Sequence, residues 1–244
     1  MVIESRLNGC RFKNIALAMA ICLSSNPAFA DDSDDDLPRL AKGQRCLEFS
    51  ELSMTLEQNA TDGDTEVVLF AKGQDEGLKR LVIKAPDGRR VANVKGDPHG
   101  IGIREFNLES AEPEDLDLVL GSFPEGTYHF FGRTVTGECL KGDAPLSHAI
   151  APATTLLTPS EGEVVPVNQV VLSWMPIADA ERYVVELNNE TTGGEATFEV
   201  FPPTTSVAIS VHFLKPGSEY QFVVGVKTES GNVAFVELTF STAP

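Results

Sequence analysis

A seven-residue segment near the C-terminus, LKPGSEY at positions 214–220, constrains the fold more than any other feature of this chain. Pro216 fixes one backbone dihedral and Gly217 tolerates a positive φ, so the segment that begins at Leu214 is a tight turn leading into a strand. A tyrosine at the start of such a strand, here Tyr220, bonds its hydroxyl to upstream backbone in the tyrosine corner of a β-sandwich. The segment therefore predicts an architecture and carries no chemistry of its own.

A second segment of this kind, FPEGTY, ends at Tyr128. Short apolar-rich stretches around it are predicted to be strands, at residues 66–71, 78–84, 101–108 and 127–135. A single helical turn is expected over residues 112–120, because Pro113 suits an early helical position. This part of the chain therefore resembles a sandwich with one short helical interruption.

The C-terminal part shows the alternation of half-buried strands more clearly. Strands are predicted at residues 170–174, 182–187, 207–211, 220–226 and 233–240. The first of them ends in Trp174, the only tryptophan, which is expected in the core. The whole pattern predicts an all-β chain of two tandem β-sandwich domains, at residues 42–150 and 156–244, joined by a linker at 151–155.

The C-terminal half resembles a fibronectin type III domain over residues 155–244. The resemblance rests on Leu172-Ser173-Trp174, on the strand that carries Tyr183, and on the corner formed by Leu214, Pro216, Gly217 and Tyr220. The whole chain also resembles a group of secreted bacterial proteins with a β-rich domain ahead of a fibronectin-like one. That resemblance is carried by residues 61–64, 79–81, 86–90, 109–113 and 123–128, and it implies an architecture and a compartment but no activity.

The first thirty residues have the pattern of a secretory signal peptide. Three basic residues precede a nine-residue apolar or small run at 15–23, and Ala28-Phe29-Ala30 follows. Cleavage is expected between Ala30 and Asp31, which places the chain in the periplasm or outside the cell without membrane insertion. The alternative is a short membrane anchor, but nine residues are too few to span a bilayer as a helix. The acidic residues 31–41 are expected to form a disordered leader.

The charge of the chain excludes some partners. Removal of residues 1–30 takes away three basic side chains and one acidic one, so the net charge moves from −17 to −19. A field of this sign repels phosphate backbones and anionic lipids, so nucleic acid is not expected as a partner. It attracts cations or basic partners, although acidic surfaces are often simply solvated.

Two cysteines, Cys46 and Cys139, remain after the signal peptide is removed. A disulfide between them suits an oxidising compartment, and two buried thiols are the alternative. The pair is too widely spaced for a CxxC redox or zinc site.

The best candidate for chemistry is the polar segment at residues 57–66. It offers oxygen ligands from five side chains around Gly63, and calcium takes several oxygens at once: Glu57, Asn59, Asp62, Asp64 and Glu66. The spacing does not fit an EF-hand loop. The alternative is a polar turn between two strands, in which Asp62-Gly63 simply supplies the turn conformation.

No motif for a hydrolase, a metalloprotease or a phosphate-binding loop occurs in the sequence. Among the four histidines only His99 lies beside a carboxylate in a turn-like context, and a surface loop is the simpler explanation. We therefore expect a non-enzymatic, exported interaction or structural module with an unknown protein partner and no cofactor. Its recognition surface is expected in loops such as 228–232 or at an exposed sheet edge. A calcium- or carbohydrate-binding module is the first alternative, and an unrecognised hydrolase is the second.

Overall fold

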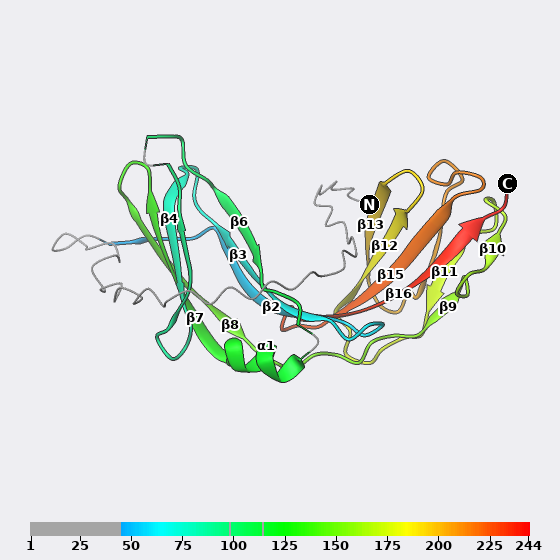
Figure 1. Cartoon of the computed structure of the whole chain (residues 1–244), viewed down its shortest axis with the longest axis horizontal. Helices are drawn as coiled ribbons and strands as arrows, with labels where there is room; N and C mark the ends of the chain where they lie inside the picture. The colour runs from blue at the N-terminus through cyan, green and yellow to red at the C-terminus, as the bar shows by residue number, and fades with distance from the viewer. Residues whose placement is uncertain (1–44, 98, 114) are drawn as a thin grey trace, which may run out of the picture.

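The computed structural model of the chain describes residues 45–97, 99–113 and 115–244. The predicted signal peptide and acidic leader lie outside these residues. The described chain consists of two β-sandwiches, which lie side by side in a U-shaped molecule (Figure 1). The all-β fold class is thereby confirmed. No helix in the described part of the chain is long and apolar enough to cross a membrane.

The N-terminal sandwich packs a five-stranded sheet against three strands. The five strands, in spatial order, are β1 (Leu47–Glu48), β8 (Cys139–Leu146), β7 (Gly126–Thr134), β4 (Leu78–Lys84) and β5 (Arg90–Lys95). The three facing strands are β2 (Glu51–Asn59), β3 (Thr65–Lys72) and β6 (Glu105–Glu109). Strand β3 alternates between buried and half-buried residues along its whole length, which is why one face of it enters the core. The centre of this core is formed by Met54, Val67, Leu81, Ile83 and Phe130.

The C-terminal sandwich has three strands on one side and four on the other. The three-stranded sheet contains β14 (Ser206–Ala208), β11 (Val171–Trp174) and β9 (Leu156–Thr158). The four strands are β13 (Gly194–Val200), β12 (Arg182–Asn189), β15 (Glu219–Lys227) and β16 (Val233–Thr242), and β10 (Val164–Val165) pairs with β16. Trp174 is buried between these layers, with its ring 5.4 Å from that of Tyr183. A buried tryptophan cannot serve as a sugar-stacking platform.

Both tyrosine segments form hydrogen-bonded corners. The hydroxyl of Tyr220 accepts a hydrogen bond of 2.7 Å from the backbone N–H of Lys215. The hydroxyl of Tyr128 donates one of 3.0 Å to the carbonyl of Pro124. Both side chains are buried, so each corner satisfies a polar group that burial would otherwise leave without a partner.

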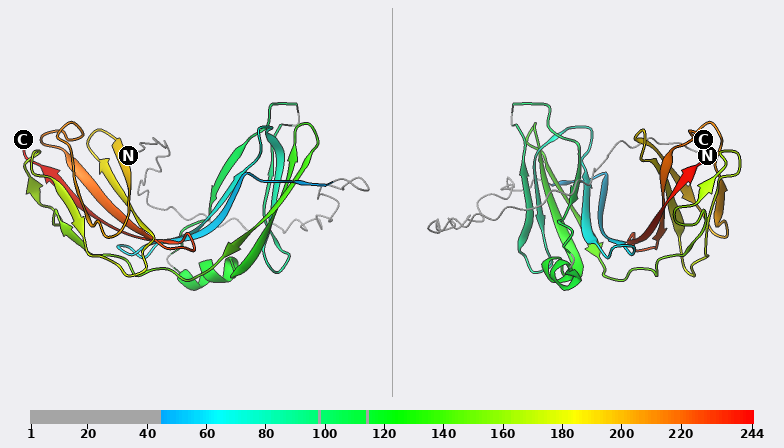
Figure 2. Two further views of the ribbon diagram at one scale, coloured as in Figure 1. Left: turned by 180° about the vertical axis from the view of Figure 1, so that it is seen from behind. Right: turned by 45° about the vertical axis from the view of Figure 1, so that its right-hand side comes forward.

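The two sandwiches share a sheet, which the sequence did not indicate. Strand β16 of the C-terminal sandwich pairs in parallel with β2 of the N-terminal one, so that residues 233–235 lie beside residues 57–59. The result is an eight-stranded sheet whose main path runs β13-β12-β15-β16-β2-β3-β6. Its strands line the inner, concave side of the U in each view (Figures 1 and 2). The segment expected to act as a linker is also packed, because Thr154 is buried and its hydroxyl donates to the Met175 carbonyl over 2.6 Å.

The helix begins later than expected. Helix α1 (Leu116–Ser122) starts after Asp115, whose carboxylate accepts a hydrogen bond from the backbone N–H of Leu118. An aspartate cap satisfies a free N–H at the helix start, whereas a proline at the first position offers no such acceptor. Pro113 therefore precedes the helix rather than opening it.

The described cysteines are joined. Cys46 and Cys139 form a disulfide with their Cα atoms 4.7 Å apart. It ties the residue before β1 to the first residue of β8, and these two short segments also pair in parallel. The bridge therefore connects the start of the N-terminal sandwich to its last strand.

Candidate functional site

The tip of the hairpin formed by β2 and β3 reaches the C-terminal sandwich. The backbone N–H of Ala60 donates to the carbonyl of Phe235 over 2.8 Å, and the N–H of Glu237 donates to the hydroxyl of Thr61 over 3.0 Å. These bonds extend the short parallel pairing of β2 with β16. The polar segment that suggested calcium chemistry therefore helps to join the two sandwiches.

Asn232 is the centre of this junction. It is fully buried, and its side-chain oxygen accepts a hydrogen bond of 2.8 Å from the backbone N–H of Leu56. Its amide nitrogen donates to the carbonyls of Ser147 and Ala149, each over 2.8 Å. A single side chain thus satisfies three backbone groups on the other side of the junction. The loop at 228–232, in which the sequence predicts a recognition surface, ends in this buried contact.

A glycine and an aromatic ring shape the sheet beside the junction. Gly225 of β15 lies opposite Phe235 of β16, and a Cβ atom at position 225 would come within 2.5 Å of the Phe235 ring. The ring therefore lies over the glycine, on the concave face of the sheet. Glycine is required here because any larger side chain would displace the phenyl group.

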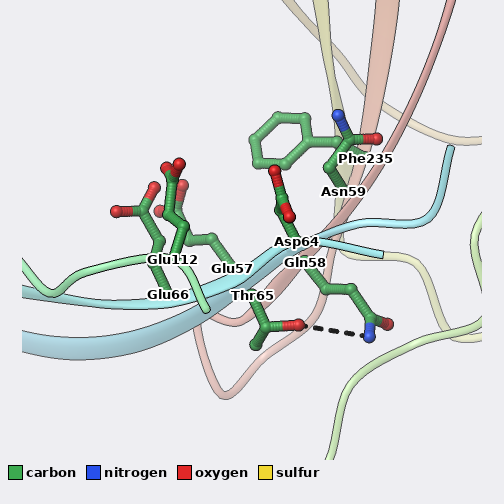
Figure 3. Close-up of a pocket in the computed structure, with 8 residues that line it drawn as sticks. All are labelled: Glu57, Gln58, Asn59, Asp64, Thr65, Glu66, Glu112 and Phe235. Atoms are coloured by element: carbon green, nitrogen blue, oxygen red, sulfur yellow. Dashed lines mark hydrogen bonds between the residues drawn. The ribbon is translucent and has the colours of Figure 1, made fainter. Parts of the chain in front are cut away.

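The five predicted calcium ligands separate into two groups. Glu57 and Glu66 are direct cross-strand partners, and their carboxylates lie together with that of Glu112 in a shallow pocket (Figure 3). Asp64 and Asn59 line the same pocket beside Phe235.

The remaining oxygens of this segment build the hairpin turn. The side chain of Asn59 accepts from the N–H of Thr61 over 3.0 Å, and that of Asp62 accepts from the N–H of Asp64 over 3.2 Å. Gly63 adopts a φ of 90°, as the turn requires. No group of three or more aspartate, glutamate, histidine or cysteine side chains is arranged to hold a metal ion within the described ranges. Calcium binding stays a prediction without geometric support.

The electrostatics of the pocket are unfavourable in the free protein. Burial, and then the negative charges of Glu112, Glu109 and Glu57, raise the pKa of Glu66 from 4.5 to about 7. Burial likewise raises the pKa of Glu57, and Lys227 only partly offsets this. Like charges opposite each other on neighbouring strands are destabilising, so this arrangement costs stability at neutral pH.

We predict that Glu66→Gln stabilises the protein above neutral pH. The folded-state pKa of Glu66 is higher than the unfolded value, so the folded chain holds a proton that the unfolded chain loses, and stability falls as pH rises from 4.5 to 7. Glutamine removes this cost. After discounting for the half-exposed position, the free energy of unfolding should rise by about 1–2 kcal/mol at pH 8 and hardly change at pH 4.

Urea denaturation at both pH values measures this effect. Glu48→Gln, at an exposed position on β1, is the matched control and should leave stability unchanged at both pH values. Equal effects of the two substitutions, or a gain that persists at pH 4, would contradict the prediction.

The residues that sequence reasoning missed lie on strands far apart in the chain. Glu186 on β12 and Glu237 on β16 face the same side of the shared sheet as Glu57, and burial raises the pKa of both carboxyls. Alternation along β12 was a usable signal, because it places Glu186 on the face opposite Val185 and Leu187. No sequence signal links that face to residues 57–66.

Comparison with known proteins gives similarity at the level of fold. No family model and no curated protein matches the chain. Among solved structures, the chicken CNTN1 FN1–FN3 domains are 12% identical, with a TM-score of 0.31, and the match covers 80% of this chain and 65% of that one. A two-domain fibronectin type III segment of chicken tenascin is 13% identical with a TM-score of 0.29, over 80% of this chain and 97% of that one. A tetra-tandem repeat from the extending region of a large adhesion protein is 14% identical with a TM-score of 0.28, and the match covers 78% of this chain and 48% of that one.

Proposed function

We propose that this chain is an exported, non-enzymatic module that holds two β-sandwiches in a fixed arrangement and presents their shared concave sheet to a protein partner. The observation that carries the proposal is the buried Asn232 junction, which fixes one sandwich to the other. Flexible tandem domains expose such contacts to water, whereas three hydrogen bonds from one buried side chain demand a defined geometry.

The histidine side chains support a role without catalysis. Throughout the residues that the structure describes, no histidine ring is hydrogen-bonded to a serine or threonine hydroxyl or to a cysteine thiol. The closest carboxylate to a histidine is Asp143, 2.8 Å from His129, and both side chains are exposed. His99 is almost fully exposed, with Asp97 as its neighbour. Activation of a nucleophile by histidine needs the ring within hydrogen-bond reach of a hydroxyl or thiol, and none of the described histidines is placed in this way.

Partner capture tests the proposal. Chain 31–244, immobilised through its C-terminus, is incubated with a periplasmic extract at two salt concentrations. We expect specific retention of one or a few proteins, and competition by an excess of the free chain. Retention that the free chain does not compete, together with turnover in a broad hydrolase panel, would overturn the proposal in favour of an enzyme.

A measurement of the mature N-terminus tests export. The full-length chain expressed in a bacterial host should be recovered outside the cytoplasm. Its mass should equal that of a polypeptide whose first residue is Asp31. An intact Met1 in the cytoplasmic fraction would contradict the assignment to an exported class.

A further inference from the structure

The register of the shared sheet places one set of side chains on its concave face. Val233 and Phe235 lie beside Glu57 and Asn59, and residues paired in this way point to the same side of a sheet. The residues next to them, such as Leu56, enter the core of the N-terminal sandwich, so this set points away from the core. We call this surface the concave face and define it by six residues, namely Glu186, Val223, Phe235, Glu57, Glu66 and Glu109.

Three carboxylates of the concave face have no ion-pair partner among the described residues. Within the described residues, no lysine, arginine or histidine nitrogen lies within ion-pair distance of Glu66, Glu109 or Glu186. Three cations lie on or beside this face. Arg182 pairs with Glu199 over 3.0 Å, Lys72 lies 3.1 Å from Glu51, and the charge of Lys227 lowers the pKa of Glu57 without cancelling the effect of burial. The free protein therefore keeps several unneutralised charges on a partly desolvated surface.

The spread of these carboxylates selects the shape of the partner. Glu186 and Glu109 lie on β12 and β6, which are separated by five interstrand steps of about 4.8 Å, or roughly 24 Å across the strands. The register offsets the two residues by six further positions, or roughly 20 Å along the strands. A single metal ion reaches ligands only within about 2.6 Å, so it cannot neutralise this row. An extended peptide of about nine residues spans the combined distance at roughly 3.4 Å per residue.

Apolar side chains between the charges select the type of cation. Phe235 on β16 and Val68 on β3 are half-buried on the concave face, and Val223 lies between Glu186 and Glu237. Lysine and arginine bury their aliphatic stems on such surfaces while their charged ends reach carboxylates. A second copy of this chain, an anionic membrane or a nucleic acid carries the wrong charge.

We propose that the concave face binds an extended, lysine- or arginine-rich segment of a partner protein. This inference rests on the proposed function, because it names the surface and the partner class of the same interaction module. Cationic side chains placed along the row neutralise carboxylates that repel one another in the free protein.

Octalysine labelled with fluorescein is the probe, and its anisotropy is measured with chain 31–244 at pH 8 in 50 and 150 mM salt. The test variant carries Glu66→Gln, Glu109→Gln and Glu186→Gln. It removes mutual repulsion, so it is expected to fold at least as well as the parent chain. We expect its affinity for octalysine to fall by at least tenfold.

A variant of equal net charge is the control. It carries Glu48→Gln, Glu138→Gln and Asp143→Asn, which lie on or beside the five-stranded sheet away from the concave face. Its affinity should stay within twofold of the parent at the same salt concentration. Equal losses of affinity in the two variants would mean that net charge alone binds the probe, and this result would overturn the inference. Unchanged affinity in both variants would also overturn it.

The two proposals fail in different ways. If partner capture succeeds but octalysine does not compete with the captured protein, the inference about the concave face is wrong and the interaction module stands. If nothing specific is captured while the probe binds the concave face selectively, the proposed function fails and the surface assignment stands.

Discussion

Replacing Asn232 with alanine should lower the free energy of unfolding by about 2–4 kcal/mol and uncouple the two sandwiches. The substitution leaves the buried N–H of Leu56 and the part-buried carbonyls of Ser147 and Ala149 without their partner. Each buried group that loses its hydrogen bond costs about 1–3 kcal/mol, and partial access of water reduces the sum.

Two probes of urea denaturation show the uncoupling. Trp174 is the only tryptophan, so its fluorescence reports the C-terminal sandwich, whereas circular dichroism reports both. The two transitions should coincide more closely in the parent chain than in Asn232→Ala, where the signals should separate. Asn188→Ala is the matched control, because Asn188 bonds only to Gln221 within its own sandwich, over 3.1 Å. If Asn232→Ala lowers the free energy of unfolding no more than Asn188→Ala does, the junction adds no stability.

Asn232→Asp separates hydrogen bonding from packing. The substitution keeps the acceptor for Leu56 and nearly the same volume, but it places a second oxygen against two carbonyl oxygens. At pH 8 we expect Asn232→Asp to lower the free energy of unfolding at least as much as Asn232→Ala does, because the aspartate buries a negative charge beside carbonyl oxygens that cannot donate a hydrogen bond to it. Stability equal to the parent would contradict the assigned orientation of the amide.

Removing the disulfide should destabilise the N-terminal sandwich by about 2–4 kcal/mol. Cys46 and Cys139 are separated by 93 residues, and closing a loop of that length restricts the unfolded chain strongly. The double substitution Cys46→Ala with Cys139→Ala should shift the circular dichroism transition to lower urea. The Trp174 fluorescence transition should shift less, since the bridge lies wholly in the other sandwich.

Reduction provides the internal control for this prediction. A reductant should destabilise the parent chain by a similar amount and leave the double variant unchanged. A reductant effect on the double variant, or no effect on the parent, would contradict the role of the bridge.

Local patterns predict the sandwiches well and their connection poorly. The turn at Pro216 and Gly217 and the alternation around Tyr183 depend on residues close in sequence, so both sandwiches follow from them. Strand β13 (Gly194–Val200) is an edge strand with few strongly apolar residues, so alternation in the sequence does not predict it. Strand β2 was missed for a different reason, because its last residues are polar and resemble a loop.

The site required contacts that no local pattern contains. Glu57 and Glu66 are close in sequence, and their grouping was predictable as a polar hairpin. Val233 and Glu57 are 176 residues apart, and their pairing depends on how two folded sandwiches meet. Asn232 appeared in sequence as an ordinary loop residue, because only the assembled junction buries it. The interpretation of 57–66 as a metal loop was therefore made without these neighbours and stays a prediction.

The parallel pairing of β16 with β2 also sets an order of events during folding. The outer side of β2 near residues 57–59 has no neighbour until residues 233–235 fold beside it. An uncovered strand edge invites pairing with other chains. The C-terminal sandwich thus closes an edge of its predecessor, and protection of the first domain waits until residues 233–235 are in place.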